Sequence, residues 1–200
     1  MSAALWEIED GLHAEGYKVI CGVDEAGRGP LAGPVCAAAV ILPRDARLEG
    51  LNDSKMLSAK RRELLYDEIV SAAAAYGIAF ADVREIEELN ILNATYLAMN
   101  RAVSAMGADI DLALIDGDRA SGVEFPNRTV VKGDAKCASI AAASILAKVT
   151  RDRYMCDLAA EYPEYGFEKH KGYGTKEHYA AIREYGPCPE HRVKFLRKMH

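Results

Sequence analysis

The chain has 200 residues, of which 50% are hydrophobic and 28% are charged. This composition is typical of a globular protein that buries one substantial core, so we expect one domain over residues 1–200. No stretch contains the roughly eighteen uninterrupted apolar residues that a membrane span requires. The N-terminus is acidic, whereas a signal peptide is basic and then apolar. We therefore expect a cytoplasmic protein without a membrane association.

The charge of the chain is unevenly distributed. A net charge of −5 and a pI near 5.6 argue against indiscriminate binding to nucleic acid, because neutralisation of phosphates supplies most of that affinity. Residues 168–200 nevertheless carry eight Lys and Arg against four Asp and Glu, a net charge of +4. This segment is either a basic binding face or a solvated helical surface.

The five cysteines are odd in number and include no CxxC pair, which predicts reduced thiols. Cys188 and His191 have the spacing of two zinc ligands. A structural zinc site needs about four ligands, and no second pair has a matching spacing. We therefore expect no zinc site.

The first half of the chain predicts three strands and two helices. The apolar runs at 17–23 and 35–42 are separated by Gly and Pro, as in a hairpin of two buried strands. Ser58 is placed to cap a helix that runs to about Ala75, and residues 76–83 then alternate like a third strand. From Glu85 to Met106 apolar residues recur every three or four positions, which predicts one amphipathic helix.

The second half predicts two short strands and a long helix. Residues 112–115 and 129–131 are strand candidates, and each ends at a charged cluster. Residues 135–162 are rich in Ala and lack Gly and Pro, so we expect a helix with Asp134 as its N-cap. A Gly-rich loop, a short helix capped by Thr175 and a basic tail follow.

Four acidic residues follow apolar strand candidates. Asp24 and Glu25 close the first strand, Asp116 closes another, and Asp134 follows the last. Carboxylates that leave a buried sheet need a partner, and Mg²⁺ prefers carboxylates together with water and phosphate oxygens. Two such ions about 4 Å apart activate a water and stabilise the leaving oxygen of a phosphodiester. The four acids therefore predict a metal-dependent nuclease.

Two features complicate this interpretation. Adjacent side chains of a strand point to opposite faces, so we expect the strand to break after Asp24 and Glu25, at Ala26 and Gly27. Alternatively, Glu25 contributes its backbone carbonyl. Each acid taken singly is also explained as a turn or helix-cap residue.

Residues 27–32, GRGPLA, fit a loose dinucleotide-binding pattern that the surrounding sequence contradicts. Two acids precede the pattern and would repel a pyrophosphate, and a strand-like run follows where that fold needs a helix. The glycines instead allow the backbone to approach a substrate closely, and Arg28 is available for a phosphate or carboxylate.

These residues belong to a longer series of motifs that resembles bacterial ribonuclease HII. The motifs are DEAGRGPLAGPV (24–35), NDSKMLS (52–58), LNILNATYLAMNRAV (89–103), IDGD (115–118), KGDAKCASIAAASILAKVTRD (132–152) and HKGYGTKEH (170–178). The similarity extends from about Val19 to Arg192. It implies an α/β, RNase H-like fold in which helices flank a mixed five-stranded sheet. The core would occupy about 17–160, and a helical, substrate-binding C-terminal extension about 161–200.

The resemblance also implies roles for individual residues. Asp24, Glu25, Asp116 and Asp134 would be the catalytic residues that bind Mg²⁺ or Mn²⁺. Further residues would bind substrate, namely Gly27, Arg28, Gly29, Ser54, Lys55 and Tyr173. The backbone of the Gly-Arg-Gly motif would contact the 2′-hydroxyl, which distinguishes RNA from DNA. Tyr173 would sense the junction between a ribonucleotide and the next deoxyribonucleotide, and Ser54 with Lys55 would contact phosphate.

One departure from the family pattern lies near the C-terminus. Residues 191–195 read His-Arg-Val-Lys-Phe, with Lys194 where the family commonly has Ser. The departure touches no catalytic position and affects only the terminal helix and its contacts. No clamp-binding motif with paired aromatics follows Phe195, so we expect no such partner. No heptad pattern or large exposed apolar stripe is evident, so we expect a monomer.

The sequence thus predicts an endonuclease that hydrolyses RNA in RNA/DNA hybrids and cuts 5′ of single ribonucleotides embedded in duplex DNA. Two metal ions would orient the attacking water, leaving 3′-hydroxyl and 5′-phosphate ends. Such an enzyme would remove ribonucleotides from DNA and RNA primers. Two alternatives stay open: another nuclease or strand-transfer enzyme on the same fold, and a hybrid-binding protein whose acids are structural.

Overall fold

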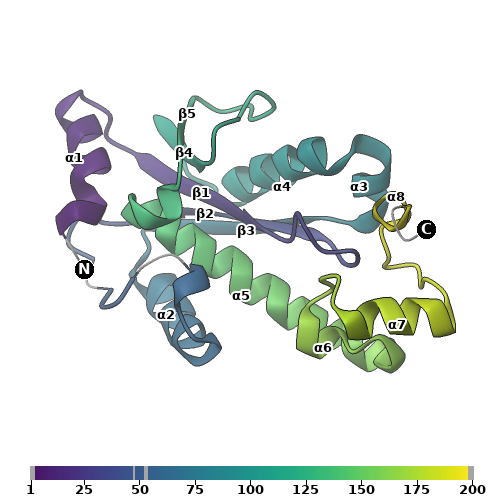
Figure 1. Ribbon diagram of the computed structural model, residues 1–200. Helices are drawn as coiled ribbons and strands as arrows, with labels where there is room; N and C mark the ends of the chain where they lie inside the picture. The colour runs from purple at the N-terminus through teal and green to yellow at the C-terminus, as the bar shows by residue number, and fades with distance from the viewer. Residues whose placement is uncertain (1–2, 47, 52–53, 198–200) are drawn as a thin grey trace.

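A mixed five-stranded sheet forms the centre of the computed structural model, which describes residues 3–46, 48–51 and 54–197 (Figure 1). The strands are β1 (Ile20–Ala26), β2 (Val35–Ile41), β3 (Ala75–Ala81), β4 (Leu112–Asp116) and β5 (Asn127–Val130), in the order β3-β2-β1-β4-β5. β2 pairs antiparallel with β1 and β3, whereas β4 pairs parallel with β1 and β5. The predicted α/β fold, mixed sheet and first hairpin are confirmed.

Helices cover both faces of the sheet (Figure 1). The α-helices are α1 (Glu7–Ala14), α2 (Ala59–Ala72), α3 (Val83–Leu89), α4 (Ile91–Ala105), α5 (Ala138–Glu161), α6 (Phe167–His170), α7 (Lys176–Tyr185) and α8 (Val193–Leu196). Short 3-10 helices are η1 (Ala3–Trp6), η2 (Ser54–Met56), η3 (Gly133–Ala135) and η4 (Pro163–Tyr165). Among the described residues, no helix has the length and apolar character needed to cross a lipid bilayer.

The small residues of β2 explain how helices pack on both of its faces. Cys36, Ala38 and Val40 belong to the core under α2 and α5, whereas Val35, Ala37 and Ala39 belong to the core under α4. A strand buried on both faces reads as a continuous apolar run, which is what the sequence shows. The alanines of α5 let this helix lie close against the sheet.

Two predicted helices differ from those observed: the helix over 85–106, and the helix expected to begin after Asp134. The helix expected over 85–106 is two helices, separated at Asn90, whose φ of 69° is tolerated by Asn. The Asn90 side chain then caps α4 by accepting hydrogen bonds from the N–H groups of Leu92 and Asn93. Ser58 and Thr175 are helix caps as predicted.

Asp134 is not the N-cap of α5. It lies in η3, and α5 begins four residues later at Ala138. The N–H of Ser139, in the first turn of α5, donates instead to Glu9 Oε1 of α1 at 3.0 Å. Asp134 instead lies near Asp24 and Asp116, in the group of carboxylates described below.

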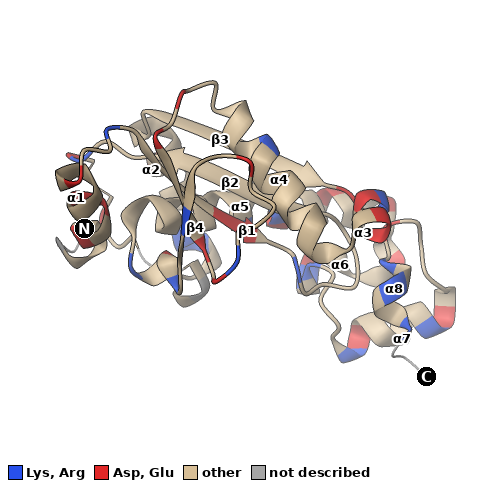
Figure 2. Cartoon of the chain, turned by 90° about the horizontal axis from the view of Figure 1, so that it is seen from above, with Lys and Arg blue, Asp and Glu red and all other residues tan. Residues whose placement is uncertain are grey.

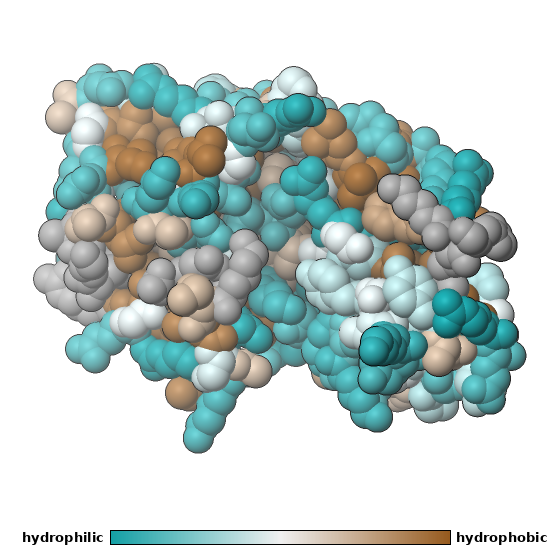
Figure 3. Space-filling view, in the orientation of Figure 1, coloured by the Kyte–Doolittle hydropathy of each residue, from teal (hydrophilic) through white to brown (hydrophobic). Residues whose placement is uncertain are grey.

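The surface seen in Figure 3 is mostly hydrophilic. A hydrophobic patch on this face lies between α1 and β5, where Ile8, Leu12 and Val130 line a shallow hollow. β5 is an edge strand of the sheet, and α1 packs beside it.

We expect Gly22→Ala to destabilise the fold by about 3 kcal/mol, because a Cβ at this position of β1 would overlap the backbone of Ser139 and Ile140. Gly11→Ala is the matched control. Gly11 lies in the middle of α1 with open space around it, so this change should stabilise the protein by about 0.5–1 kcal/mol. Urea unfolding measures both. Equal effects of the two changes would contradict this account of how α5 packs on β1.

The C-terminal helices enclose a buried pair of histidines. His178 Nε2 and His191 Nε2 are 3.0 Å apart, and the two side chains are 0% and 1% exposed. His191 Nδ1 accepts from the Cys188 N–H, so His191 is neutral and donates through Nε2 to His178 Nε2. His178 Nε2 is then an acceptor, so His178 is neutral as well. Burial and, to a smaller extent, a neighbouring imidazole together lower the pKa of each ring to about 4.

Acid should therefore destabilise the fold. The neutral rings contribute stability above the ordinary histidine pKa of about 6.5, and this stability is lost as the pH falls towards about 4. Between about pH 7 and pH 5 we expect a loss of roughly 1–2 kcal/mol for each ring, measured by urea unfolding. His191→Asn should reduce this pH-dependent loss, whereas a change at the exposed His13 should leave it intact. An unchanged loss in His191→Asn would contradict the assignment.

Candidate functional site

Three carboxylates meet at one edge of the sheet. Asp24 lies on β1 and Asp116 ends β4, and the parallel register of these neighbouring strands pairs Val23 with Ile115. Asp134 comes from η3, which is tied to β4 because the Gly133 N–H donates to Asp116 Oδ1 at 2.6 Å. One ligand oxygen from each of the three acids lies within 4.8 Å of the other two.

This crowding is electrostatically unfavourable for the carboxylates alone. Burial raises the pKa of Asp24 well above its usual range, and the charges of Glu25 and Asp116 raise it further. Hydrogen bonds from the Ser144 side chain and the Glu25 N–H oppose the shift. A divalent cation at this position would favour the ionised form of every acid in the group. The donor set, three carboxylates in a partly buried pocket, therefore fits a hard divalent metal ion.

Glu25 is placed differently from the other three acids. β1 ends at Ala26 and Gly27 has a φ of 100°, so the strand breaks at Ala26 and Gly27 as predicted. Asp24 and Glu25 nevertheless both lie within the strand and point to opposite faces. Glu25 is outside the three-carboxylate group, and its Oε1 lies 3.2 Å from Arg28 Nη1. With Arg28 and Asp116 it lines a second hollow that reaches towards Arg119.

A cavity beside the carboxylates brings together most of the sequence-predicted residues. Its lining includes Asp24, Glu25, Asp116, Gly27, Arg28, Gly29, Ser54 and Tyr173. Tyr173 is 45% exposed, and its Cε1 would lie 3.7 Å from a Cβ on Gly29, so the tyrosine ring stands beside the Gly-Arg-Gly motif. Asp134 is the one predicted acid outside this lining, although it belongs to the carboxylate group.

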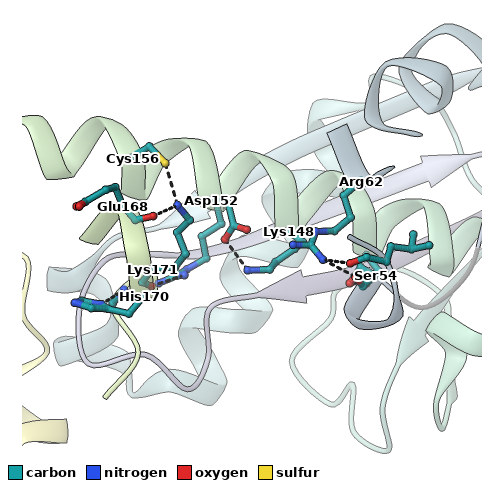
Figure 4. Close-up of polar contacts among 12 residues, drawn as sticks. Ser54, Arg62, Lys148, Asp152, Cys156, Glu168, His170 and Lys171 are labelled. Atoms are coloured by element: carbon teal, nitrogen blue, oxygen red, sulfur yellow. Dashed lines mark hydrogen bonds and ion pairs between the residues drawn. The ribbon is translucent and has the colours of Figure 1, made fainter. Parts of the chain in front are cut away.

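The Ser54 hydroxyl is buried and lies 2.8 Å from Ser144 Oγ, and the Ser54 carbonyl accepts a hydrogen bond from Arg62 Nη1 at 2.9 Å (Figure 4). Ser54 thus reaches the cavity but is already hydrogen-bonded within the protein. The side chain of its predicted partner, Lys55, lies outside the described part of the structure, so the phosphate-contacting pair is not seen together.

The loop from Gly27 to Gly33 is held by a buried arginine that the sequence did not identify. Arg192 is 0% exposed and donates to the carbonyls of Gly27, Arg28, Pro30 and Gly33 at 2.6–3.1 Å. Burial lowers the pKa of Arg192 to about 9, and the charge of Arg151 contributes. One side chain thus binds four carbonyl groups of the loop and holds them around itself.

The basic C-terminal segment is only in part a binding face. Arg192 is buried, and Lys194 contacts acidic α3, where its backbone N–H donates to Glu87 Oε1 at 3.0 Å and its Nζ donates to the Glu87 carbonyl. Figure 2 shows basic α8 beside the acidic residues of α3. Arg192 and Lys194, two of the basic residues expected on a nucleic-acid-binding face, therefore make contacts within the protein.

Two residues of α5 also line the cavity and were missed from sequence. Ser144 and Lys148 are one helical turn apart, and Lys148 Nζ lies 2.6 Å from Asp152 Oδ1 on the next turn (Figure 4). Burial lowers the pKa of Lys148, and the interaction with Asp152 opposes the shift. Polar residues four positions apart in the mostly apolar first half of α5 were the available signal.

Comparison with known proteins gives a consistent result. A family model described as ribonuclease HII matches residues 21–200. Ribonuclease HII of Caldicellulosiruptor bescii is 53% identical over 194 residues, which cover 97% of this chain and 94% of the relative. The Burkholderia mallei enzyme of the same name is 57% identical over 178 residues, 89% of this chain and 83% of the relative.

Solved structures agree on the fold. The crystal structure of ribonuclease H2 from Pyrococcus horikoshii matches with a TM-score of 0.74 and 28% identity, covering 91% of this chain and 97% of that one. A ribonuclease HIII solved in complex with Mn²⁺ matches with a TM-score of 0.67 over 87% of this chain and 65% of that one, and at 19% identity it shows the shared fold alone. The chain therefore belongs to the ribonuclease HII family and is a ribonuclease H, an endonuclease that acts on the RNA of RNA/DNA hybrids.

Proposed function

We propose that this enzyme also cuts on the 5′ side of single ribonucleotides embedded in duplex DNA, leaving 3′-hydroxyl and 5′-phosphate ends. Its roles in the cell would be removal of ribonucleotides from DNA and of RNA primers. The observation that carries this proposal is that the carboxylate group opens onto the same cavity as Gly29 and Tyr173. Cleavage chemistry and recognition of a ribonucleotide junction then share one site.

Asp24, Glu25, Asp116 and Asp134 would hold two divalent ions, Mg²⁺ or Mn²⁺. Bound ions would supply an activated water and neutralise charge at the leaving 3′-oxygen. Support for Mn²⁺ comes from the ribonuclease HIII of the same fold, which was solved with that ion. Because the Glu25 side chain points to the opposite face of β1 from Asp24, Glu25 would join through its backbone carbonyl.

The remaining site residues would bind the substrate. The backbone of Gly27, Arg28 and Gly29 would contact the 2′-hydroxyl, which is absent from DNA. The Tyr173 ring would pack on the sugar that follows the ribonucleotide. Ser54 and Lys55 would contact a phosphate, and the Ser54 hydroxyl would exchange its contact with Ser144 to do so.

We further propose one catalytic domain over residues 1–200 that acts as a monomer. Residues 17–160 would form its core and residues 161–200 a substrate-binding extension. The position of Tyr173 in the extension, beside Gly29 of the core, supports this division. Light scattering of the purified protein would test the monomer.

The proposal predicts cleavage of a labelled DNA duplex that carries one ribonucleotide. With Mg²⁺ or Mn²⁺ we expect a single nick on the 5′ side of the ribonucleotide, and EDTA should abolish it. Asp116→Asn should lower kcat at least about a hundredfold while binding of the duplex is retained, because it removes a carboxylate ligand of the metal site. Cleavage of long hybrids alone would contradict junction recognition, and binding without any cleavage would favour a non-catalytic protein.

Gly29 and Gly27 provide a matched test of substrate contact. A Cβ on Gly29 meets only the Tyr173 ring, at an ordinary 3.7 Å, so Gly29→Ala should fold normally yet raise the KM for the single-ribonucleotide duplex about tenfold. Gly27 has a φ of 100°, and a Cβ there would overlap the Arg151 side chain, so Gly27→Ala should lower the melting temperature as well. A normal KM for Gly29→Ala would contradict the proposed contact.

A further inference from the structure

The loop that carries Tyr173 is anchored by the buried histidines of the C-terminal helices. The Tyr173 carbonyl lies 2.9 Å from His178 Nδ1 and also accepts a hydrogen bond from the Thr175 N–H. The Tyr173 side chain itself is exposed in the cavity. The backbone of the residue proposed to meet the substrate is thus held from inside the protein.

The contacts determine which nitrogen of each ring carries a hydrogen. A carbonyl only accepts, so His178 Nδ1 carries the hydrogen and His178 Nε2 accepts. His191 Nε2 must therefore donate across the 3.0 Å contact, and His191 Nδ1 must accept. It does so from the N–H and the thiol of Cys188, at 3.0 and 3.1 Å. One directed chain of hydrogen bonds runs from Cys188 to the Tyr173 carbonyl.

Neighbouring rings hold His178 in one orientation. His170 stacks on it with centroids 4.4 Å apart and planes inclined by 17°, and Phe167 meets it edge-on at 5.5 Å. His170 is fixed in turn, because its Nδ1 accepts from the Gly172 N–H and its Nε2 contacts the Tyr165 carbonyl. Figure 4 shows His170 beside Lys171 at the start of the Tyr173 loop.

The same pair is connected to the loop that carries Gly29. His191 forms an isolated β-bridge with Ala32, and the Leu31 N–H donates to the Gly172 carbonyl at 2.8 Å. A Cβ on Gly172 would lie only 2.6 Å from the Ala32 carbonyl, so the two loops are in close contact. His178 contacts the Tyr173 loop through its side chain, and His191 pairs with the Gly29 loop through its backbone.

We propose that His178 and His191 are positioning residues that set the Tyr173 ring relative to Gly29 and thereby determine the preference for a ribonucleotide junction. The inference rests on the substrate role proposed above for Tyr173. Neither histidine touches the substrate. Their effect passes through the Tyr173 carbonyl, so it concerns substrate recognition and leaves the metal site unchanged.

Two variants of His178 separate this role from simple packing. His178→Asn keeps an N–H near the position of Nδ1 and can still donate to the Tyr173 carbonyl, whereas His178→Gln places its amide near Nε2 and reaches only His191. Both lose the same aromatic contacts. We expect His178→Gln to raise the KM for the single-ribonucleotide duplex about tenfold, with kcat changed less than about twofold, and His178→Asn to stay within about threefold of the unchanged enzyme. Equal losses in both variants would overturn the proposal.

A second arm tests whether the effect passes through Tyr173. In a Tyr173→Ala background, His178→Gln should cause no further rise in KM, because its target is gone. An additional rise there would overturn the proposal. If Tyr173→Ala alone leaves the junction preference intact, the proposed function of Tyr173 fails; if it abolishes the preference and His178→Gln does not change it, only the positioning role fails.

The unchanged enzyme provides a readout that needs no variant. Nitrogen-15 NMR of labelled histidines should show His178 with its hydrogen on Nδ1 and His191 with its hydrogen on Nε2 at neutral pH. The opposite tautomers would overturn the proposal even if every variant failed to fold.

Discussion

The parallel pairing of β1 with β4 is the constraint on which the rest of the structure depends. It puts Asp24 and Asp116 side by side at one edge of the sheet, and η3 adds Asp134. Like charges in a partly buried place repel, so the surrounding backbone must hold them against that force. The hydrogen bond from the Gly133 N–H to Asp116 and the close packing of α5 on β1 do this.

Two distant parts of the chain meet in the cavity beside that edge. The loop after β1 carries Gly29, and the loop before α7 carries Tyr173. Neither loop has a regular secondary structure of its own, so each relies on buried side chains for its shape. Arg192 holds the first loop and His178 holds the second. Both supports come from the C-terminal segment, which makes that segment a structural part of the site.

The sequence predicted those features that follow from local patterns. The apolar run at 35–42 is a strand because small residues suit a strand covered on both faces, and Ser58 and Thr175 cap helices as their positions suggest. The division of a helix at Asn90 was missed because the flanking apolar period continues across it. Asp134 likewise has the residue type and sequence position of a helix N-cap. The acceptor for the Ser139 N–H in the first turn of α5 is instead Glu9, which is far away in sequence.

The site was predicted less completely, for a related reason. The four acids were predicted from their positions after apolar strands, and the substrate-binding residues from the resemblance to a known family. Ser144 and Lys148 were missed because only the folded chain shows that they face the cavity. Arg192 was counted as part of a basic surface, since nothing local distinguishes an exposed arginine from one surrounded by backbone carbonyls. Whether a charged side chain is buried depends on contacts between segments that are distant in sequence. The amino-acid sequence alone does not show these contacts.

The late position of Arg192 in the chain has a consequence for biosynthesis. The four acids lie in the first 134 residues and leave the ribosome well before Arg192 does. Until then the Gly27–Gly33 loop lacks the guanidinium that occupies its carbonyls. A nascent chain therefore presents its four acids before the Gly27–Gly33 loop can take its final shape, and the loop gains its supporting guanidinium only once Arg192 has been synthesised.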